Sequence, residues 1–155
     1  MRQAVRQTLT ILKSESFLNN EDTQNALLWA LKFADDKALT AQKAIRELGE
    51  GFIAEEALAI AVYCALKAKS YTEGVLTAVN HDGNSSGTGS ICGNILGALY
   101  GYKALPKDWL AMLELRDFLE HMTRILHQAA SIRGIRFAGQ RENPAEFAGM
   151  WADAP

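Results

Sequence analysis

The spacing of apolar and polar residues predicts a chain built from helices. Apolar residues recur at helical spacing through most of the sequence before residue 131, which places them on one face of each segment. No segment shows a convincing alternation with a period of two, so the expected fold class is all-α. The expected helices cover residues 2–13, 20–36, 40–48, 54–66, 70–80, 89–101 and 107–130.

Two of these segments carry a stronger expectation. Residues 57–66 have almost no polar face, and a helix that is apolar all round lies buried, so we expect this one at the centre of the core. Residues 107–130 are expected to break near Glu114 and to turn their apolar side chains inward. Those side chains are Trp109, Met112, Leu113, Phe118, Leu119, Met122, Ile125 and Leu126.

The pattern fails after Ser131, where glycines and prolines punctuate the sequence. We therefore expect two parts, a helical domain over residues 1–130 and an irregular C-terminal tail over residues 131–155.

Residues 80–101 combine a polar stretch with a stripe of glycines. Residues 80–88 are small and polar, which predicts a loop able to bring backbone N–H groups and side-chain oxygens close to a ligand. The glycines that follow recur every four residues, so on a helix they fall roughly on one line. Each glycine inside a helix costs about 1 kcal/mol relative to alanine, so four glycines on one line need a structural reason. A groove that a neighbouring helix approaches closely provides one, and the stripe predicts such a groove. Its members are Gly89, Gly93, Gly97 and Gly101.

Residues 78–101 read Ala-Val-Asn-His-Asp-Gly-Asn-Ser-Ser-Gly-Thr-Gly-Ser-Ile-Cys-Gly-Asn-Ile-Leu-Gly-Ala-Leu-Tyr-Gly. This run resembles the C-terminal signature of the ADP-ribosylglycohydrolase family. Residues 49–64, Gly-Glu-Gly-Phe-Ile-Ala-Glu-Glu-Ala-Leu-Ala-Ile-Ala-Val-Tyr-Cys, resemble a second family block that stands upstream of the first. The resemblance covers roughly residues 20–125 and implies a compact multi-helix bundle of the family type, truncated to its C-terminal part.

The resemblance also implies a chemistry, from which this sequence departs. In the family, two aspartates of the loop help to hold a pair of magnesium ions, which bind the ribose of ADP-ribose and assist its hydrolysis from a modified residue. Asn84 and Ser86 stand at those two metal positions, and Gly87 stands where the family has serine or threonine. Because magnesium prefers charged oxygen ligands, we expect its binding here to be weak or absent.

The remaining family elements of catalysis lie in an N-terminal half. No Thr-Asp-Asp run, which supplies the other metal ligands of the family, occurs in the 155 residues, and we assign no catalytic residue. The candidate ligand-binding residues are those of the loop: His81, Asp82, Gly83, Ser85, Gly87, Thr88 and Gly89.

Other readings of the loop fit less well. A calcium-binding EF-hand loop that began at Asp82 would need a glutamate at its twelfth position, where Gly93 stands. A dinucleotide-binding fingerprint fails because its last glycine falls on Cys92. Asp82 could hold one weakly bound cation together with Asn84 and Ser86, or it could cap the following turn, and the cap is favoured.

The glutamates that precede the loop and the histidines of the chain are interpreted as structural residues. Glu55 and Glu56 are expected in the first turn of a helix, where one of them can also brace the glycine loop by accepting backbone hydrogen bonds. Adjacent helical residues point about 100° apart, so the two glutamates are not expected to share a site. For His81 we expect a structural hydrogen bond. His121 and His127 are six residues apart, a spacing that does not suit a helical metal pair.

Composition limits the class of protein. Net charge is −2, hydrophobic residues make up 48% of the chain, and no Lys/Arg run stands out, so nucleic-acid binding has no support. No apolar stretch reaches the length of a membrane span, and the N-terminus lacks the apolar segment of a signal peptide. Cys64 and Cys92 stand in apolar helical context, so we expect buried, reduced thiols in a cytoplasmic protein.

Three functions stay open at this point. The favoured one is a degenerate ADP-ribosylglycohydrolase-like protein, a pseudoenzyme that is inactive alone and binds a protein partner or an ADP-ribose-like ligand. The second is a magnesium-dependent hydrolase, completed by another chain, that removes ADP-ribose from a modified target. The third is a purely structural interaction module. A helical core without its N-terminal half exposes apolar surface, so we also expect a protein partner or a homo-oligomer that covers it.

Overall fold

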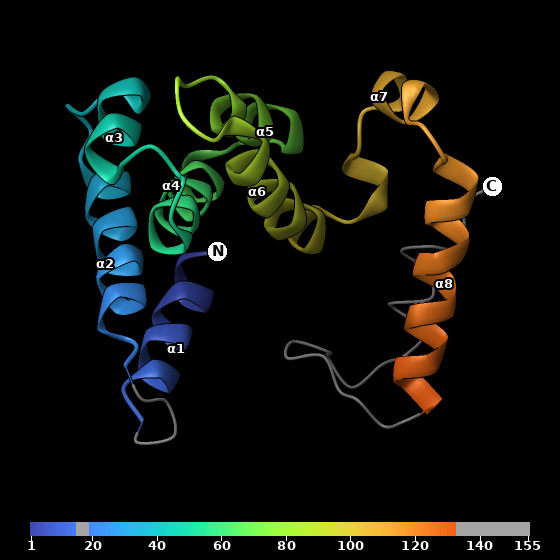
Figure 1. The fold of residues 1–155 in the computed structure, drawn as a ribbon, viewed down its shortest axis with the longest axis horizontal. Coiled ribbons are helices and arrows are strands. Elements are labelled where there is room, and N and C mark those ends of the chain that lie inside the picture. Colours follow the sequence, from blue (N-terminus) through green and yellow to red (C-terminus); the bar gives the residue numbers. More distant parts are fainter. Residues whose placement is uncertain (15–18, 133–155) are drawn as a thin grey trace. The chain divides into compact units, whose positions relative to one another are not determined.

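The computed structural model describes residues 1–14 and 19–132, and these residues form helices joined by short connections with no strand among them. This confirms the expected all-α fold class (Figure 1). The helices are α1 (Arg2–Leu12), α2 (Glu21–Asp35), α3 (Ala41–Leu48), α4 (Ala54–Lys67), α5 (Tyr71–Val79), α6 (Ser85–Tyr100), the short 3-10 helix η1 (Tyr102–Ala104), α7 (Lys107–Met112) and α8 (Arg116–Ile132). None of the helices described here combines the length and the apolar character of a membrane-spanning segment.

The chain divides into two compact units, Met1–Ala104 and Leu105–Pro155, and each is treated by itself. The expected C-terminal tail lies outside the described residues from residue 133 onward, while its first two residues belong to α8. The expected domain boundary after residue 130 therefore stays a prediction.

Helix α4 lies at the centre of the first unit and packs against α2, α3, α5 and α6 (Figure 1). Its residues Ala59 to Ala65 are all buried, and Ile60 and Tyr63 are fully enclosed. The expectation of a buried central helix is confirmed. Alanines alternate with larger side chains along α4, and the small residues let the neighbouring helices approach it closely.

Polar caps set the ends of several helices at the expected places. Thr40 Oγ1 accepts a hydrogen bond from the Lys43 N–H at 3.4 Å, and Ser70 Oγ accepts one from the Glu73 N–H at 3.1 Å. Gly49 follows α3 with a φ of 120°, a conformation that only glycine adopts without strain.

Both cysteines are buried and unpaired in the first unit, as expected. Burial raises the pKa of the Cys92 thiol to about 11. It also raises the pKa of the Cys64 thiol, to which the nearby Cys92 adds a smaller effect. Both thiols therefore stay protonated near neutral pH.

Helix α5 approaches only part of the glycine stripe of α6 closely. Helix α5 packs against α6, and a Cβ at Gly89 would collide with the Val79 side chain, whereas a Cβ at Gly93 would lie 3.2 Å from Tyr71 Oη. Nothing lies within 4 Å of the corresponding position at Gly97, and Gly101 ends the helix with a φ of 77°. The expected groove is thus present at the first two glycines only.

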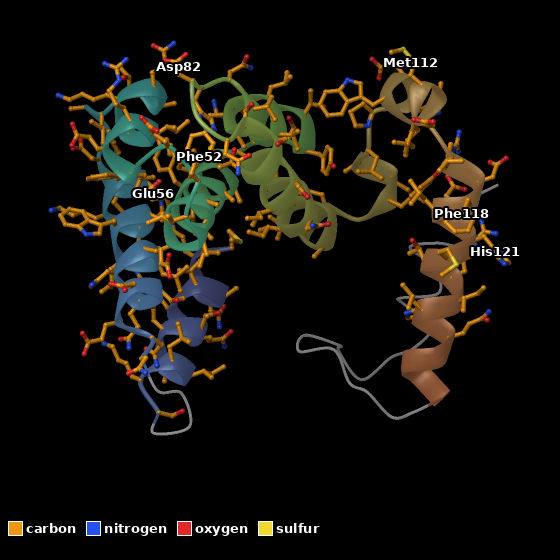
Figure 2. All side chains as sticks on the ribbon, in the orientation of Figure 1. Phe52, Glu56, Asp82, Met112, Phe118 and His121 are labelled. Carbon is orange, nitrogen blue, oxygen red and sulfur yellow. The ribbon has the colours of Figure 1, made fainter. Side chains whose placement is uncertain are left out.

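The second unit contains α7 and α8, with a break at residues 113–115 that confirms the interruption expected near Glu114. The expectation that its apolar side chains point inward is wrong for this unit taken by itself. Met112 is 85% exposed and Phe118 is 57% exposed (Figure 2). Of the other residues expected to point inward, Leu113, Leu119, Met122, Ile125 and Leu126 are also exposed, while Trp109 is half-buried. Two helices alone offer too few partners to enclose such a face.

Candidate functional site

The polar loop is shorter than expected because α6 begins at Ser85 and not after residue 88. Asn84 is the N-cap of α6, and its Oδ1 accepts hydrogen bonds from the Gly87 N–H at 3.1 Å and from Ser86 Oγ at 3.2 Å. An asparagine in this position satisfies an N–H group that has no partner inside the helix. The cap therefore recruits residues 85–88 into the helix despite their low helix propensity.

Thr88 anchors the loop from inside the protein. Its side chain is fully buried, and Oγ1 donates its proton to the carbonyl oxygen of Ala78 at 2.7 Å. His81 lies beside it, with Nδ1 accepting from the Gly83 N–H at 3.1 Å and Nε2 at 2.9 Å from Thr88 Oγ1. Because Nδ1 accepts, the proton of a neutral imidazole is on Nε2, which donates to Thr88. The structural hydrogen bond expected for His81 is confirmed.

A relay of hydrogen bonds ties the loop to the start of α4. Glu56 Oε2 accepts from the backbone N–H groups of Glu50 at 3.1 Å and Gly51 at 3.0 Å. The carbonyl oxygen of Glu50 in turn accepts from the Asn84 N–H at 2.8 Å. A Cβ at Gly83 would collide with the backbone of Glu50, so only glycine permits this approach. Glu56 thus braces the loop, as expected of one of the two glutamates, but through the linker that precedes α4.

The candidate ligand-binding residues fall into two groups. Thr88 and Gly89 are buried and hold the loop in place. The side chains of Asp82 and Ser86 are exposed, and Gly83, Ser85 and Gly87 are half-buried between them. Asp82 does not cap the following turn, because the cap is Asn84, two residues later. The carboxylate of Asp82 accepts no hydrogen bond within the part of the chain that the structure describes (Figure 2).

The metal positions of the family loop do not fit a magnesium ion here. Asn84 Oδ1 already accepts two hydrogen bonds, and Ser86 Oγ donates one of them. A carbonyl oxygen has two lone pairs, so Asn84 has no free one to offer. Across residues 1–14 and 19–132, no three His, Cys, Asp or Glu side chains come together as a metal site. His121 and His127 lie on α8, in the other unit.

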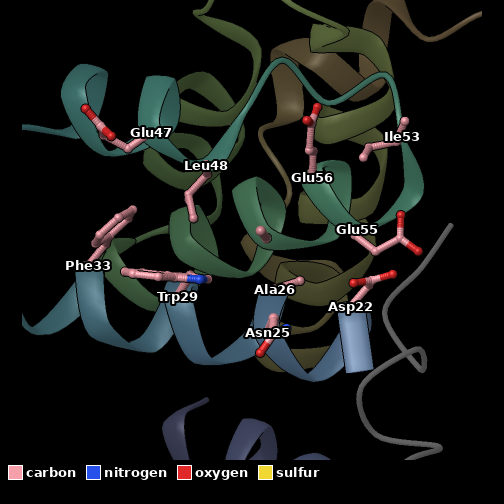
Figure 3. A pocket seen from close by; sticks show the side chains of 11 residues that line it. Asp22, Asn25, Ala26, Trp29, Phe33, Glu47, Leu48, Ile53, Glu55 and Glu56 are labelled. Atoms are coloured by element: carbon pink, nitrogen blue, oxygen red, sulfur yellow. The ribbon is translucent and has the colours of Figure 1, made fainter. Parts of the chain in front are cut away.

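Sequence reasoning missed a cavity of about 550 Å³ in the first unit, between α2, the end of α3 and the start of α4 (Figure 3). Contrary to expectation, Glu55 and Glu56 both line it, because the cavity is wide enough to extend across the first turn of α4. The full lining is Asp22, Asn25, Ala26, Trp29, Phe33, Glu47, Leu48, Ile53, Glu55, Glu56 and Ala59. The spacing of Asp22, Trp29 and Phe33 along α2 was the sequence signal available for this cavity. The residues of α3 and α4 that line its other sides are distant in sequence, so the spacing alone did not reveal it.

Comparison with known proteins gives a consistent picture. The sequence profile of the ADP-ribosylglycohydrolase family matches residues 1–135. An uncharacterised protein of Archaeoglobus fulgidus is 29% identical over 109 residues, which are 70% of this chain and 35% of that protein. The human ADP-ribosylhydrolase ARH3 is 24% identical over 105 residues, which are 61% of this chain and 29% of ARH3. The chain thus spans about a third of the length of these curated relatives. No solved structure matches it.

Proposed function

The chain belongs to the ADP-ribosylglycohydrolase family, and from this premise we propose that it is by itself a non-hydrolytic member, a pseudoenzyme that binds an ADP-ribose-like ligand or a protein partner. Its loop resembles the family signature in sequence but lacks the two aspartates of that signature. A metal-assisted hydrolysis needs a metal to polarise the substrate and position the water. This loop offers one exposed carboxylate, Asp82, in place of the aspartate pair.

The observation that carries the proposal is the use made of Asn84. Its side-chain oxygen closes the first turn of α6 through the Gly87 N–H, and Ser86 donates to the same oxygen. Both positions that the resemblance assigns to metal ligands therefore serve the helix start. What remains at the surface is a rim of small residues, 82, 83 and 85–87, which lets a ligand or a partner approach the backbone.

Apolar surface near this rim supports a protein partner. Phe52 is 69% exposed and Ile53 is 57% exposed, and both follow directly after the Gly51 N–H that Glu56 holds. Large apolar side chains that are adjacent and exposed mark interaction surfaces. The buried, unpaired cysteines agree with a cytoplasmic location.

A second function is favoured by the share of the relatives that the chain covers. Because it spans about a third of their length, another polypeptide or a second copy could supply the remaining family residues. The active assembly would then be a magnesium-dependent hydrolase that releases ADP-ribose from a modified target. In that assembly Asn84 and Ser86 would act as ligands only after releasing the hydrogen bonds that they make at the start of α6.

Calorimetric titration with ADP-ribose, with and without magnesium, tests the proposal. We expect the affinity of the native chain to be the same in both conditions. The double variant Asn84→Asp/Ser86→Asp restores two carboxylates, and aspartate caps a helix as well as asparagine does, so the variant keeps its fold. We expect magnesium to raise the ADP-ribose affinity of this variant only.

Two results would contradict the proposal. Magnesium-dependent binding by the native chain would mean that the neutral loop still builds a metal site. Release of ADP-ribose from a modified protein by the purified chain would show hydrolysis without a partner. Absence of ADP-ribose binding in both conditions would leave the protein partner as the ligand of this chain.

A further inference from the structure

The cavity between α2, α3 and α4 has two chemically different ends. Trp29 and Phe33 form one end, with ring centroids 5.4 Å apart and ring planes tilted by 48°. Asp22 and Glu55 lie at the other end, where their carboxylates come from the first turns of α2 and α4 (Figure 3). Asp22 and Trp29 are seven residues apart on α2, which separates them by about 10 Å along the helix axis.

The acidic end has no internal counter-charge. Neither Asp22 nor Glu55 is part of an ion pair within the described residues, and no lysine, arginine or histidine lines the cavity. Glu56 also lines it, but its carboxylate is held by the Glu50 and Gly51 N–H groups. A bound cation would therefore meet two carboxylates at this end without competition from a cation of the lining.

The aromatic end already accepts a cation from the protein itself. The Lys32 ammonium lies 4.2 Å from the centre of the Trp29 ring, although Lys32 does not line the cavity. This contact shows that the ring is accessible to a positive charge. Trp29 is 47% exposed, so the ring can also receive apolar surface from solution.

We propose that this cavity binds a small amphipathic amine, with its ammonium group between Asp22 and Glu55 and its apolar body against Trp29 and Phe33. The volume of about 550 Å³ suits such a molecule, since small-molecule sites enclose about 300–1,000 Å³. The ammonium donates hydrogen bonds to both carboxylates, and an apolar body a few carbons long reaches the rings. This site is separate from the loop of residues 80–84, and its occupation does not depend on the function proposed for that loop.

Three ligands test the two ends of the site on the native chain. Phenylbutylamine carries both the ammonium and the apolar body, phenylbutanol carries the body without the charge, and butylamine carries the charge without the ring. In calorimetric titrations at low salt we expect phenylbutylamine to bind about tenfold or more tightly than either of the others, because each lacks one set of contacts. Equal affinity of the amine and the alcohol would overturn the proposal, and so would absence of phenylbutylamine binding.

Matched variants assign the contacts. Asp22→Asn/Glu55→Gln should weaken phenylbutylamine binding about tenfold and leave phenylbutanol unaffected. Glu21→Gln/Glu50→Gln removes the same charge from residues that do not line the cavity and should have little effect. Trp29→Ala should weaken both ligands, whereas Leu28→Ala, an exposed neighbour on the same helix, should not. Equal effects of the two double variants would overturn the assignment of the ammonium to this end. The ligand series on the native chain decides the proposal even if a variant fails to fold.

Discussion

Thr88 is the residue on which the position of the loop depends most. Its hydroxyl is fully buried and connects Ala78, at the end of α5, with His81 in the loop. A valine of nearly the same shape would leave the Ala78 carbonyl and the His81 Nε2–H without their partner. An unsatisfied buried polar group costs about 1–3 kcal/mol, which is far more than an exposed one costs.

We therefore expect Thr88→Val to lower the free energy of unfolding by about 1–3 kcal/mol in urea denaturation. Thr77→Val is the matched control, because Thr77 donates to the Glu73 carbonyl at the surface, where water replaces a lost partner. That variant should change stability by less than about 0.5 kcal/mol. Equal losses in the two variants would mean that the buried network contributes nothing beyond an ordinary threonine contact.

Single residues also show where sequence reasoning reached its limit. The structural role of His81 was predictable, because a histidine next to a glycine loop readily finds backbone partners. The cap was placed on Asp82 and belongs to Asn84, two positions later. Both residue types cap helices equally well, so only the place where α6 begins distinguishes them. One of Glu55 and Glu56 was expected to brace the loop, but which of them does so, and its contact through Glu50, depends on a chain path that the sequence does not fix.

At the scale of elements, the packing of α5 against α6 separates two glycines that look alike in the sequence. An alanine methyl at Gly89 would collide with Val79, whereas one at Gly97 would meet nothing within 4 Å. We expect Gly89→Ala to destabilise the protein by about 1–3 kcal/mol, because the two helices must move apart. Gly97→Ala should stabilise it by up to about 1 kcal/mol through helix propensity.

Thermal unfolding of the two variants and of the native chain measures whether each substitution lowers or raises the stability. A loss of stability at Gly97 would mean that another surface covers this part of α6. A neutral change at Gly89 would mean that α5 and α6 are not in close contact.

Helices were predictable where the sequence carries a sustained apolar pattern. Helix α4 was evident from its unbroken apolar run, and α3 and α5 lie within the helices expected over residues 40–48 and 70–80. The start of α6 was missed because Ser85, Ser86 and Gly87 are poor helix formers, and the Asn84 cap outweighs their propensity. The periodicity of α8 identified its apolar face, but periodicity does not say whether another element covers it. The cavity could not be predicted, because it needs the relative placement of α2, α3 and α4.

At the scale of the molecule, the core belongs to the first unit. Among the residues that the structure describes, every member of the buried apolar cluster lies between Val5 and Leu96, and helices α1 to α6 supply all of them. We expect residues 1–104, produced alone, to fold with helical circular dichroism and a cooperative urea transition. A broad transition would mean that residues 105–155 are needed to complete the fold, and the full chain is the reference for both measurements.

The relay from Glu56 through Glu50 to Asn84 uses backbone atoms at every step beyond the first carboxylate. The place of the loop is therefore independent of the identity of the side chains at positions 84 to 86, apart from the need for a cap. The backbone of such a loop keeps its position while the side chains that it presents can change. Over evolutionary time, the residues at positions 84 to 86 can therefore change without loss of the fold, as long as one of them still caps α6.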